Sequence, residues 1–374
     1  MDFSFVFPCL NEEETLGQCI AALKDSLKKG AFEYEIIVAD NGSSDKSAEI
    51  ARSLGATVVS VPEKGYGAAI KGGFSAAKGR YVIFADADGS YRLEDVPALY
   101  DAAVKSDADM TIASRLNGTV EKGAMPFLHR YLGTPVLTFL INILFGGKLT
   151  DCNSGFRCVK KTSFVKWNIR ANGMEFASEL LIKALKNKSN IEEIKSGLRK
   201  DLRSRPPHLR TWRDGMRHLL FILSEKPQIM EYPGLFLIVA TSVLQIVALL
   251  TGPSSFLKLN IFDYHSHALL LLGGCIGAQL YLLGSSIYLV GSDEPLRLTR
   301  RLINMDEAQL FFILISNFTV CAAVIFWVVF VWIGRNFGNL DLINPFLAIL
   351  HFICVVGFLN IGLLGLHILK KAMK

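Results

Sequence analysis

Cysteine is sparse in this chain, and its spacing is irregular. The 374 residues include seven cysteines, and no two of them form a Cys-x-x-Cys pair. An odd number of unclustered cysteines argues against a disulfide framework and a zinc site. The chain also lacks internal repeats, low-complexity tracts and any basic cluster interleaved with aromatic residues, so nucleic acid is not an expected partner. The net charge of +6 is modest, and an anionic membrane surface is a sufficient partner for it.

Charge is missing from four long stretches in the second half of the chain. Each holds 20 to 25 residues without Asp, Glu, Lys or Arg, and they comprise residues 233–252, 268–291, 310–334 and 345–369. A helix of about 20 residues crosses roughly 30 Å of hydrocarbon and satisfies its own backbone hydrogen bonds. We therefore expect four transmembrane helices in an integral membrane protein. The alternative is a set of buried core helices in a large soluble protein.

Basic residues are unevenly distributed among the connections between these stretches. Arg297, Arg300 and Arg301 follow the second stretch and three lysines follow the fourth, whereas the other two connections carry one basic residue each. By the positive-inside rule, both termini are expected on the cytoplasmic side. The first eight residues lack the basic start of a secretory signal, so the amino-terminal half is also expected in the cytoplasm.

The first half alternates short apolar runs with amphipathic helical patterns. The runs are rich in β-branched and aromatic residues and span 3–7, 34–39, 57–61, 81–85 and 110–113. The helical patterns span 12–29, 44–54, 67–78 and 93–105. This order predicts an α/β domain with a mostly parallel sheet flanked by helices. Ligands of such sheets bind beyond the carboxyl ends of the strands, so the residues after each strand are the site candidates.

The first predicted strand is not followed by a glycine-rich turn. The sequence there reads PCLNE, whereas a dinucleotide-binding fold needs glycines to bring its backbone onto a pyrophosphate. A nicotinamide or flavin enzyme is therefore not expected. The second strand ends at Asp40, whose carboxylate can accept hydrogen bonds from a base or a ribose. A plain turn, with Ser44 capping the next helix, fits the same residues.

An acidic pair directly follows the fourth predicted strand. Asp86 and Asp88 are separated by one residue, so on an extended backbone both side chains face the same side. Hard divalent cations such as Mg²⁺ and Mn²⁺ prefer oxygen ligands and can be shared with phosphate. The position after an apolar strand favours a metal site over a solvated turn. The glycines near Lys64 decide little by themselves, because glycine also permits close packing or a helix start.

Six motifs follow one another in the order PCLNEEE, VADNGSSD, KGYGAAIKGG, FADADGSY, ASRL and DCNSGFR. Together they resemble the family 2 glycosyltransferases with the type A nucleotide-sugar fold. The most similar branch is that of the dolichol-phosphate mannose synthases and polyprenyl-phosphate glycosyltransferases, over about the first 220 residues. The resemblance implies inverting, metal-dependent transfer of a sugar from a UDP- or GDP-linked donor to a polyprenyl or dolichyl phosphate. This would take place at the cytoplasmic face of the membrane.

The resemblance also implies roles for individual residues. The donor is expected to contact Pro8, Asn11, Glu12, Asp40, Lys64, Gly67, Asp86, Ala87 and Asp88. Asp86 and Asp88 are the implied ligands of Mg²⁺ or Mn²⁺. Together with Arg115 and Arg130 they form the implied catalytic set. The acceptor phosphate is expected to meet Arg115, Arg130 and an arginine before the juxtamembrane segment, which is Arg205 or its neighbour Arg203.

The pattern departs from the branch after the acidic pair, where a leucine and a glutamine are usual and this chain has Gly89 and Ser90. This leaves the remaining metal ligand and the identity of the sugar open. The chemistry needs no strong base, because a lipid phosphate is largely dianionic at neutral pH and is itself a nucleophile. Arginines and a metal would compensate its charge. Three further acids are candidates for sugar contacts: Asp151, Glu175 and Glu179. Glu175 and Glu179 lie one helical turn apart and fit a solvated helix face equally well.

These expectations divide the chain into a cytoplasmic catalytic domain (1–207), a juxtamembrane amphipathic segment (208–232) and a transmembrane domain (233–374). Residues 126–145 and 208–229 fit either a helix in the membrane interface or an ordinary surface helix. A processive polysaccharide synthase is an alternative, although no QxxRW element occurs. A non-catalytic module or transporter that binds nucleotide sugar is another. Against it, the only ionisable acids or bases in the four stretches are His351 and His367. Homo-oligomers are possible.

Overall fold

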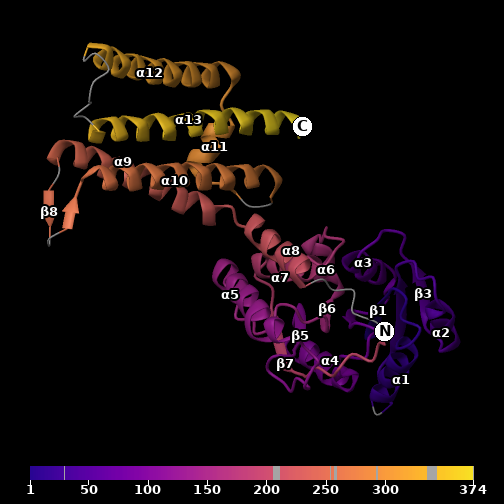
Figure 1. Ribbon diagram of the computed structural model, residues 1–374. Helices are drawn as coiled ribbons and strands as arrows, with labels where there is room; N and C mark the ends of the chain where they lie inside the picture. The colour runs from indigo at the N-terminus through magenta and orange to yellow at the C-terminus, as the bar shows by residue number, and fades with distance from the viewer. Residues whose placement is uncertain are drawn as a thin grey trace. The chain divides into compact units, whose positions relative to one another are not determined.

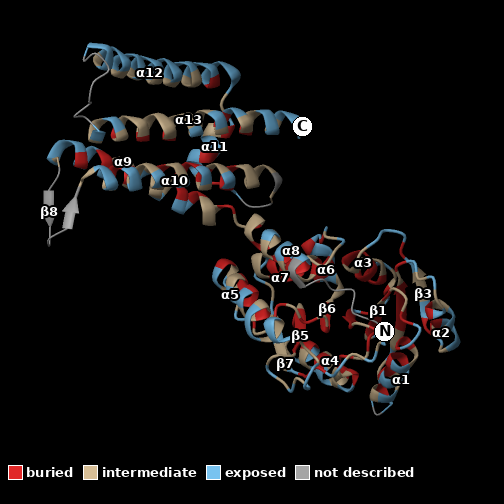
Figure 2. Ribbon diagram, viewed as in Figure 1, coloured by how far each residue is buried: buried red, intermediate tan, exposed pale blue. Residues whose placement is uncertain are grey.

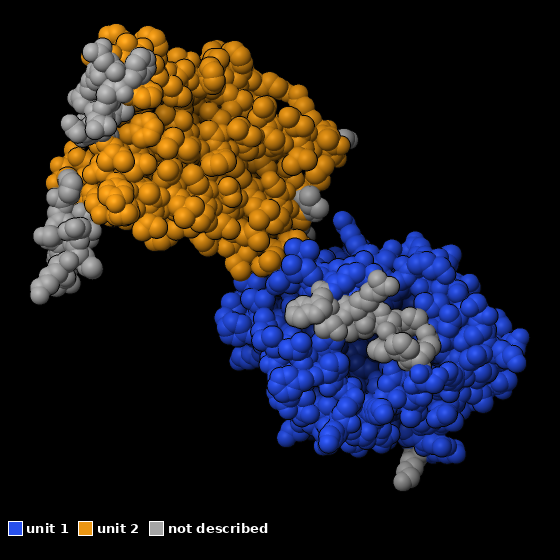
Figure 3. Space-filling view, in the orientation of Figure 1, with its two compact units in different colours: residues 1–222 blue, residues 223–374 orange. Residues whose placement is uncertain are grey.

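The structure is a computed structural model that describes residues 1–28, 30–204, 211–252, 254–256, 259–291, 294–334 and 343–373. The chain forms two compact units, residues 1–222 and residues 223–374 (Figure 3). The first unit contains a sheet with surrounding helices, and the second is mainly helical (Figure 1).

The first unit is built on a seven-stranded sheet with the order β3-β2-β1-β4-β6-β5-β7. The strands are β1 (Phe3–Cys9), β2 (Tyr34–Asp40), β3 (Thr57–Ser60), β4 (Tyr81–Phe84), β5 (Met110–Ser114), β6 (Arg157–Lys160) and β7 (Ile191–Lys195). β6 pairs antiparallel with β4 and β5, and the other pairs are parallel. The predicted α/β fold with a mostly parallel sheet is confirmed.

The helices of this unit pack on both faces of the sheet. They are α1 (Leu16–Leu27), α2 (Ser47–Ser53), α3 (Tyr66–Ala76), η1 (Leu93–Asp95), α4 (Val96–Lys105), η2 (His129–Gly133), α5 (Thr134–Phe145), α6 (Lys161–Trp167), α7 (Phe176–Lys186) and α8 (Thr211–Ser224). Phe5 of β1 belongs to the core that includes α1 and α4. Val6 faces α3, where a Cβ on Gly73 would lie 2.3 Å from its Cγ1. Alternate residues of β1 thus serve the two faces, and Figure 2 shows buried residues along the strands.

The first two helices begin later than the sequence pattern predicts. α1 starts at Leu16 instead of Glu12, and α2 starts at Ser47 instead of Ser44. The two loops bind each other in place of extending the helices. The Glu13 amide donates to Asp45 Oδ2 at 3.0 Å, and Asp45 Oδ1 accepts from the Ser47 amide at 3.0 Å. Ser44 therefore does not cap α2, because Asp45 holds the start of that helix.

Among its described residues, the second unit contains four helices that are long and apolar enough to cross a membrane: α9 (Gln228–Thr251), α10 (Tyr264–Val290), α12 (Glu307–Gly334) and α13 (Ile343–Ala372). A short hairpin of β8 (Ser254–Phe256) and β9 (Leu259–Ile261) joins α9 to α10, and α11 (Arg297–Ile303) precedes α12. The four predicted apolar stretches fall on these four helices. Glycines let α9 and α10 approach closely, since a Cβ on Gly277 would lie 2.8 Å from Leu237 Cβ.

The two histidines of the predicted apolar stretches, His351 and His367, have partners inside the second unit. His351 is fully buried on α13, and its Nε2 lies 3.1 Å from the Ser242 hydroxyl of α9. His367 Nδ1 lies 3.0 Å from the Leu363 carbonyl of its own helix. By contrast, α12 exposes most of its large apolar side chains along its length (Figure 2).

Candidate active site

The loops after β1 and β2 form one hydrogen-bonded surface at the carboxyl edge of the sheet. Asn11 adopts a left-handed φ of 57°, which asparagine tolerates better than most residues. Its Oδ1 accepts from the Ser44 amide at 2.7 Å, and its own amide donates to Ser43 Oγ at 2.9 Å. Asp40 Oδ1 accepts from the Ser43 amide at 3.1 Å. Asn11 and Asp40, both predicted to contact the sugar donor, are therefore brought together through Ser43 and Ser44. Pro8 is the next-to-last residue of β1, just before this loop.

The glycine-rich stretch before α3 is held against two other loops. Lys64 Nζ donates to the Asn41 carbonyl at 2.9 Å, and the Asn41 side chain accepts from the Gly65 amide at 2.8 Å. Gly67 lies at the start of α3, where a Cβ would come within 2.6 Å of the Ala171 carbonyl. Gly67 is thus required for close packing of this loop, whatever contact it makes with a donor.

Asp86 lies in a closed environment just beyond β4. Its Oδ1 is buried and has no hydrogen-bond partner among the described residues. A Cβ on Gly155 would lie 3.0 Å from Asp86 Oδ2, so the lack of a side chain there leaves room for the carboxylate. Burial and the nearby Asp88 charge raise the pKa of Asp86 to about 7, and the Tyr66 hydroxyl opposes part of this rise. A buried carboxylate oxygen without a hydrogen-bond partner matches the oxygen ligand that a hard divalent cation prefers.

Asp88 differs from Asp86 because both of its oxygens have donors. Oδ1 accepts from the amide and the hydroxyl of Ser90, at 2.9 and 2.6 Å, and Oδ2 accepts from Arg203 Nη2 at 3.0 Å. The residue between the two aspartates faces inward, since the Ala87 carbonyl accepts from Thr15 Oγ1 at 2.6 Å. The predicted pair therefore offers a cation the unpartnered Oδ1 of Asp86 and the Oδ2 of Asp88, which already accepts a hydrogen bond from Arg203.

Arg115 is bound by a buried carboxylate. Its Nε and Nη2 donate to Asp151 at 2.7 and 2.9 Å, and its backbone amide donates to the same side chain at 3.1 Å. Burial opposes the charge on Arg115, but Tyr91 and Asp151 raise its pKa overall. Tyr91 also accepts from the Gly155 amide at 2.6 Å. Asp151 therefore orients Arg115, and this is a structural alternative to the sugar contact expected for Asp151.

Arg130 lies on η2 beside an exposed apolar surface. Its guanidinium sits 5.4 Å from the centre of the Tyr131 ring, and no acidic side chain in the described ranges pairs with it. The neighbouring His129 has a pKa lowered by burial and by the charge of Arg115, which connects η2 electrostatically to the site. The surface, called the α5 face below, consists of Phe127, Leu128, Tyr131, Leu132, Val136, Phe139 and Ile143, all of them exposed.

The two remaining acids that were predicted to contact the sugar, Glu179 and Glu175, have different surroundings. Glu179 accepts from the amides of Arg170 and Ala171, the latter at 2.6 Å, and pairs with Lys183 at 2.8 Å. These contacts give Glu179 a clear role in shaping the loop before α7. Glu175 is half-buried at the start of α7 and accepts from the Gly173 amide at 3.1 Å.

Arg203 is the residue that links the acidic side chains of the site. Its guanidinium donates to Glu12 Oε1 at 3.2 Å, to Asp88 Oδ2 at 3.0 Å and to Asp201. The sequence left open whether Arg203 or Arg205 belongs to the site, and Arg205 lies outside the described residues. Tyr66, Tyr91 and Gly155 were not predicted as site residues. The tyrosines do stand inside the KGYG and DGSY motifs, which was the signal available for them.

The residues fit a divalent cation only in part. In the described ranges, no three His, Cys, Asp or Glu side chains converge as a complete ligand set. The unpartnered, buried Oδ1 of Asp86 nevertheless matches the oxygen ligand that such a cation prefers, and Asp88 stands two residues away. A site of this kind would need further oxygen ligands from a bound phosphate.

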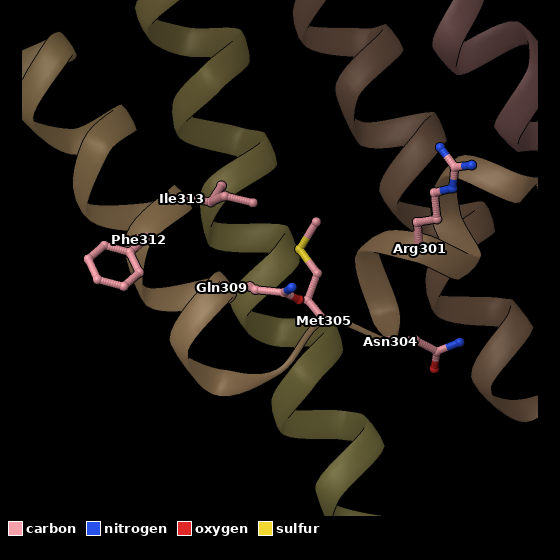
Figure 4. A pocket seen from close by; sticks show the side chains of 6 residues that line it. All are labelled: Arg301, Asn304, Met305, Gln309, Phe312 and Ile313. Carbon is pink, nitrogen blue, oxygen red and sulfur yellow. The ribbon is translucent and has the colours of Figure 1, made fainter.

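A cavity also occurs within the second unit. It has a volume of about 670 Å³ and is lined by Arg301, Asn304, Met305, Gln309, Phe312 and Ile313, from α11, α12 and the turn between them. Figure 4 shows that the Arg301 and Phe312 side chains point in different directions instead of converging. Arg301 is the one ionisable side chain among these six lining residues.

Comparison with known proteins identifies the class. A model for glycosyl transferase family 2 matches residues 4–167. The low-salt glycan biosynthesis hexosyltransferase Agl6 of Haloferax volcanii is 33% identical over 300 residues, which cover 79% of this chain and 70% of that protein. A dolichyl-phosphate hexose transferase of the same organism is 28% identical over 195 residues, covering 52% of this chain and 81% of that protein.

A mycobacterial protein of known crystal structure has a similar fold, with a TM-score of 0.50 and 24% identity over 60% of this chain and 74% of that one. The first unit thus has the type A fold of glycosyltransferases. The chain belongs to glycosyl transferase family 2. The resemblance seen in the six motifs is confirmed, and four apolar helices follow the glycosyltransferase unit.

Proposed function

We propose that this glycosyltransferase moves a hexose from a UDP- or GDP-linked donor to a polyprenyl or dolichyl phosphate at the cytoplasmic face of a membrane. The observation that carries the proposal is the buried, unpartnered Oδ1 of Asp86 beside Asp88, at the end of β4 in a family 2 chain with four apolar helices. A relative named dolichyl-phosphate hexose transferase supports the choice of acceptor.

The donor side of the proposal rests on the edge formed by β1, β2 and β4. The nucleoside would bind along the Asn11 and Asp40 loops, and the diphosphate would reach the acidic pair. Asp86 and Asp88 would hold Mg²⁺ or Mn²⁺, which supplies positive charge for the departing nucleoside diphosphate. Asp86 must lose its proton to act as a metal ligand, and its pKa of about 7 makes metal binding sensitive to pH near neutrality.

The acceptor side rests on Arg115, Arg130 and the α5 face. Asp151 fixes Arg115 through Nε and Nη2, and its Nη1 has no acceptor within the part of the chain that the structure describes. Arg130 adjoins the α5 face, whose exposed side chains include Phe127 (73%) and Phe139 (60%). An apolar face of this kind with a neighbouring cation suits the headgroup region of a bilayer. It would bring the two arginines to the level where a lipid phosphate lies.

The reaction needs charge compensation and alignment more than proton transfer. A phosphate oxygen of the acceptor attacks the anomeric carbon as the bond to the donor diphosphate breaks, and the bonding electrons leave with the nucleoside diphosphate. Attack opposite the leaving group inverts that carbon. The acceptor oxygen is already anionic, so the chain's own task is to orient it with Arg115 and Arg130 and to keep both phosphates close.

The test is a transfer assay with the full-length protein in lipid vesicles, Mn²⁺ or Mg²⁺, a panel of nucleotide sugars and undecaprenyl or dolichyl phosphate. We expect a lipid carrying one added hexose, and we expect no product from Asp88→Asn. Asp107→Asn, an exposed acid at the other end of the sheet, is the matched control and keeps activity. A polymeric product would favour a polysaccharide synthase, and nucleotide binding without turnover would favour a non-catalytic module.

The role of the α5 face has its own test. Phe139→Asn is expected to lower turnover several-fold with a long-chain acceptor in vesicles and to leave nucleotide binding unchanged. Val165→Asn on α6 alters a similarly exposed apolar side chain (70%) outside this face and serves as the control. Equal activity of the two variants on vesicles would contradict docking through α5.

A further inference from the structure

A short segment lies directly across the turn that carries the acidic pair. This segment, Arg199–Ser204, is called the strap. The Arg199 amide donates to the Ser90 carbonyl at 2.8 Å, and the Leu202 amide donates to the Asp88 carbonyl at 3.1 Å. Ser204 closes the far end, where its amide donates to Glu14 Oε2 at 2.8 Å. The strap is therefore attached to the backbone of the acidic turn and to the loop after β1.

The two residues that depart from the mannose synthase pattern both contribute to this arrangement. Gly89 has a left-handed φ of 75°, and a Cβ on it would lie 2.5 Å from Leu202 Cδ1. A leucine at position 89 would therefore strain the backbone, and the exposed Leu202 side chain of the strap would have to move. Ser90 gives Asp88 Oδ1 two hydrogen bonds. Only Oδ2 of Asp88 is then left for a cation, and Arg203 occupies it.

Arg203 supplies the only described positive charge among three carboxylates. It contacts Glu12, Asp88 and Asp201, and it is only 11% exposed. A single carboxylate oxygen of Asp88 has enough lone pairs to accept a hydrogen bond from Arg203 and to coordinate a metal at the same time. However, a divalent ion at that oxygen would stand within a few ångströms of the guanidinium, and this repulsion is large away from bulk water. Arg203 in its present position therefore disfavours a metal that is bound by both Asp86 and Asp88.

We propose that Arg203 is a resident cation on Asp88 that a divalent metal displaces, and that this displacement loosens the strap. The inference rests on the proposed use of a metal by the acidic pair. Arg203 acts here as a positioning residue, because it neutralises the site and holds the strap closed while no metal is bound. Binding of a metal by Asp86 and Asp88 would release Arg203 and so allow the strap to move away from the turn that carries these two residues.

Metal binding by the full-length protein in detergent tests the exchange without any turnover. The probe is Mn²⁺ alone, titrated and followed by the electron paramagnetic resonance signal of the free ion. Arg203→Gln is expected to bind Mn²⁺ about tenfold more tightly or better, because the competing charge is gone. Arg203→Lys keeps the charge and is expected to stay near wild type. Arg199→Gln alters a strap arginine whose guanidinium pairs with Glu94, and this matched control should not change the affinity.

Limited trypsin digestion tests the loosening of the strap. Cleavage after Lys200 and Arg203 is expected to become several-fold faster with Mn²⁺ in the wild type and to stay unchanged in Asp88→Asn. Unchanged or weaker Mn²⁺ binding by Arg203→Gln, or protection of the strap by Mn²⁺, would overturn the inference. If Arg203→Gln fails to fold, the digestion of the wild type decides. If no sugar is transferred but Mn²⁺ binding and strap cleavage respond as expected, the proposed function is rejected. The displacement of Arg203 by a metal would still be supported.

Discussion

Replacing Asp86 with asparagine is expected to stabilise the metal-free protein. The native fold raises the pKa of this carboxyl from 3.8 to about 7, chiefly through burial and the charge of Asp88. Ionised Asp86 therefore opposes folding, whereas an asparagine has a similar shape and no charge. A rise of this size corresponds to about 4 kcal/mol at most, at about 1.4 kcal/mol per pKa unit.

The effect has a definite dependence on pH. The folded pKa exceeds the unfolded one, so the contribution of Asp86 to stability is fully present below pH 3.8 and is lost as the pH rises through about 7. The advantage of Asp86→Asn over wild type is then about 1.5 kcal/mol at pH 5 and about 4 kcal/mol at pH 8. For a unit of this size, these values correspond to roughly 3–6 °C and 8–16 °C in the unfolding temperature.

The assay is thermal unfolding of the full-length protein in detergent with EDTA, at pH 5 and pH 8. Asp107→Asn is the control, because Lys160 lowers the pKa of this exposed acid and its replacement should not stabilise. Saturating Mn²⁺ should raise the unfolding temperature of the wild type at pH 8 and leave that of Asp86→Asn nearly unchanged. An Asp86→Asn protein that is no more stable than wild type at pH 8, or a gain that does not grow with pH, would refute the reasoning.

Three further predictions concern the partners of the site. Tyr66→Phe removes a hydrogen bond that lowers the pKa of Asp86, so the pH of half-maximal Mn²⁺ binding should rise by up to about one pH unit in a binding titration. Gly155→Ala places a Cβ 3.0 Å from Asp86 Oδ2 and should weaken Mn²⁺ binding at least tenfold, whereas Gly215→Ala, with open space around it, should not. Arg115→Ala leaves the buried Asp151 unpaired and should cost about 3–5 kcal/mol in thermal unfolding, a loss that Arg115→Ala/Asp151→Asn should largely recover. If the double variant were as unstable as the single one, Arg115 would not act as the counterion.

The sequence predicts most of the fold because alternating short apolar runs and amphipathic helices specify a parallel α/β sheet. It does not predict β6 and β7, since RCVK and IEEIK are short and carry charges, and the pairing of neighbouring strands stabilises them. It also places the start of α1 too early. Glu13 looks like part of a helix, but its amide binds Asp45, 32 residues further along the chain.

The candidate site likewise contains residues that the sequence predicts and residues that only the folded structure reveals. The acidic pair is predictable because it closely follows β4, and Asp40 and Asn11 likewise stand at or just after the carboxyl ends of β2 and β1. Arg203 approaches Asp88 from 115 residues further along the chain, so only the folded structure reveals their contact. Gly89 and Ser90, where the chain departs from the related pattern, contact the same part of the site, since Gly89 lies against Leu202 and Ser90 donates to Asp88. Arg115 was expected at the acceptor, and the structure adds Asp151 as the residue that orients it.

Mass spectrometry of the lipid product tests the central claim most directly. The full-length protein would be incubated in vesicles with undecaprenyl or dolichyl phosphate, a panel of UDP- and GDP-sugars and Mn²⁺, with and without excess EDTA. The account predicts a polyprenyl phosphate whose mass increases by one hexose, formed only with free Mn²⁺ or Mg²⁺ and absent with Asp86→Asn and Asp88→Asn. Transfer that continues undiminished in EDTA, or in either variant, would contradict it.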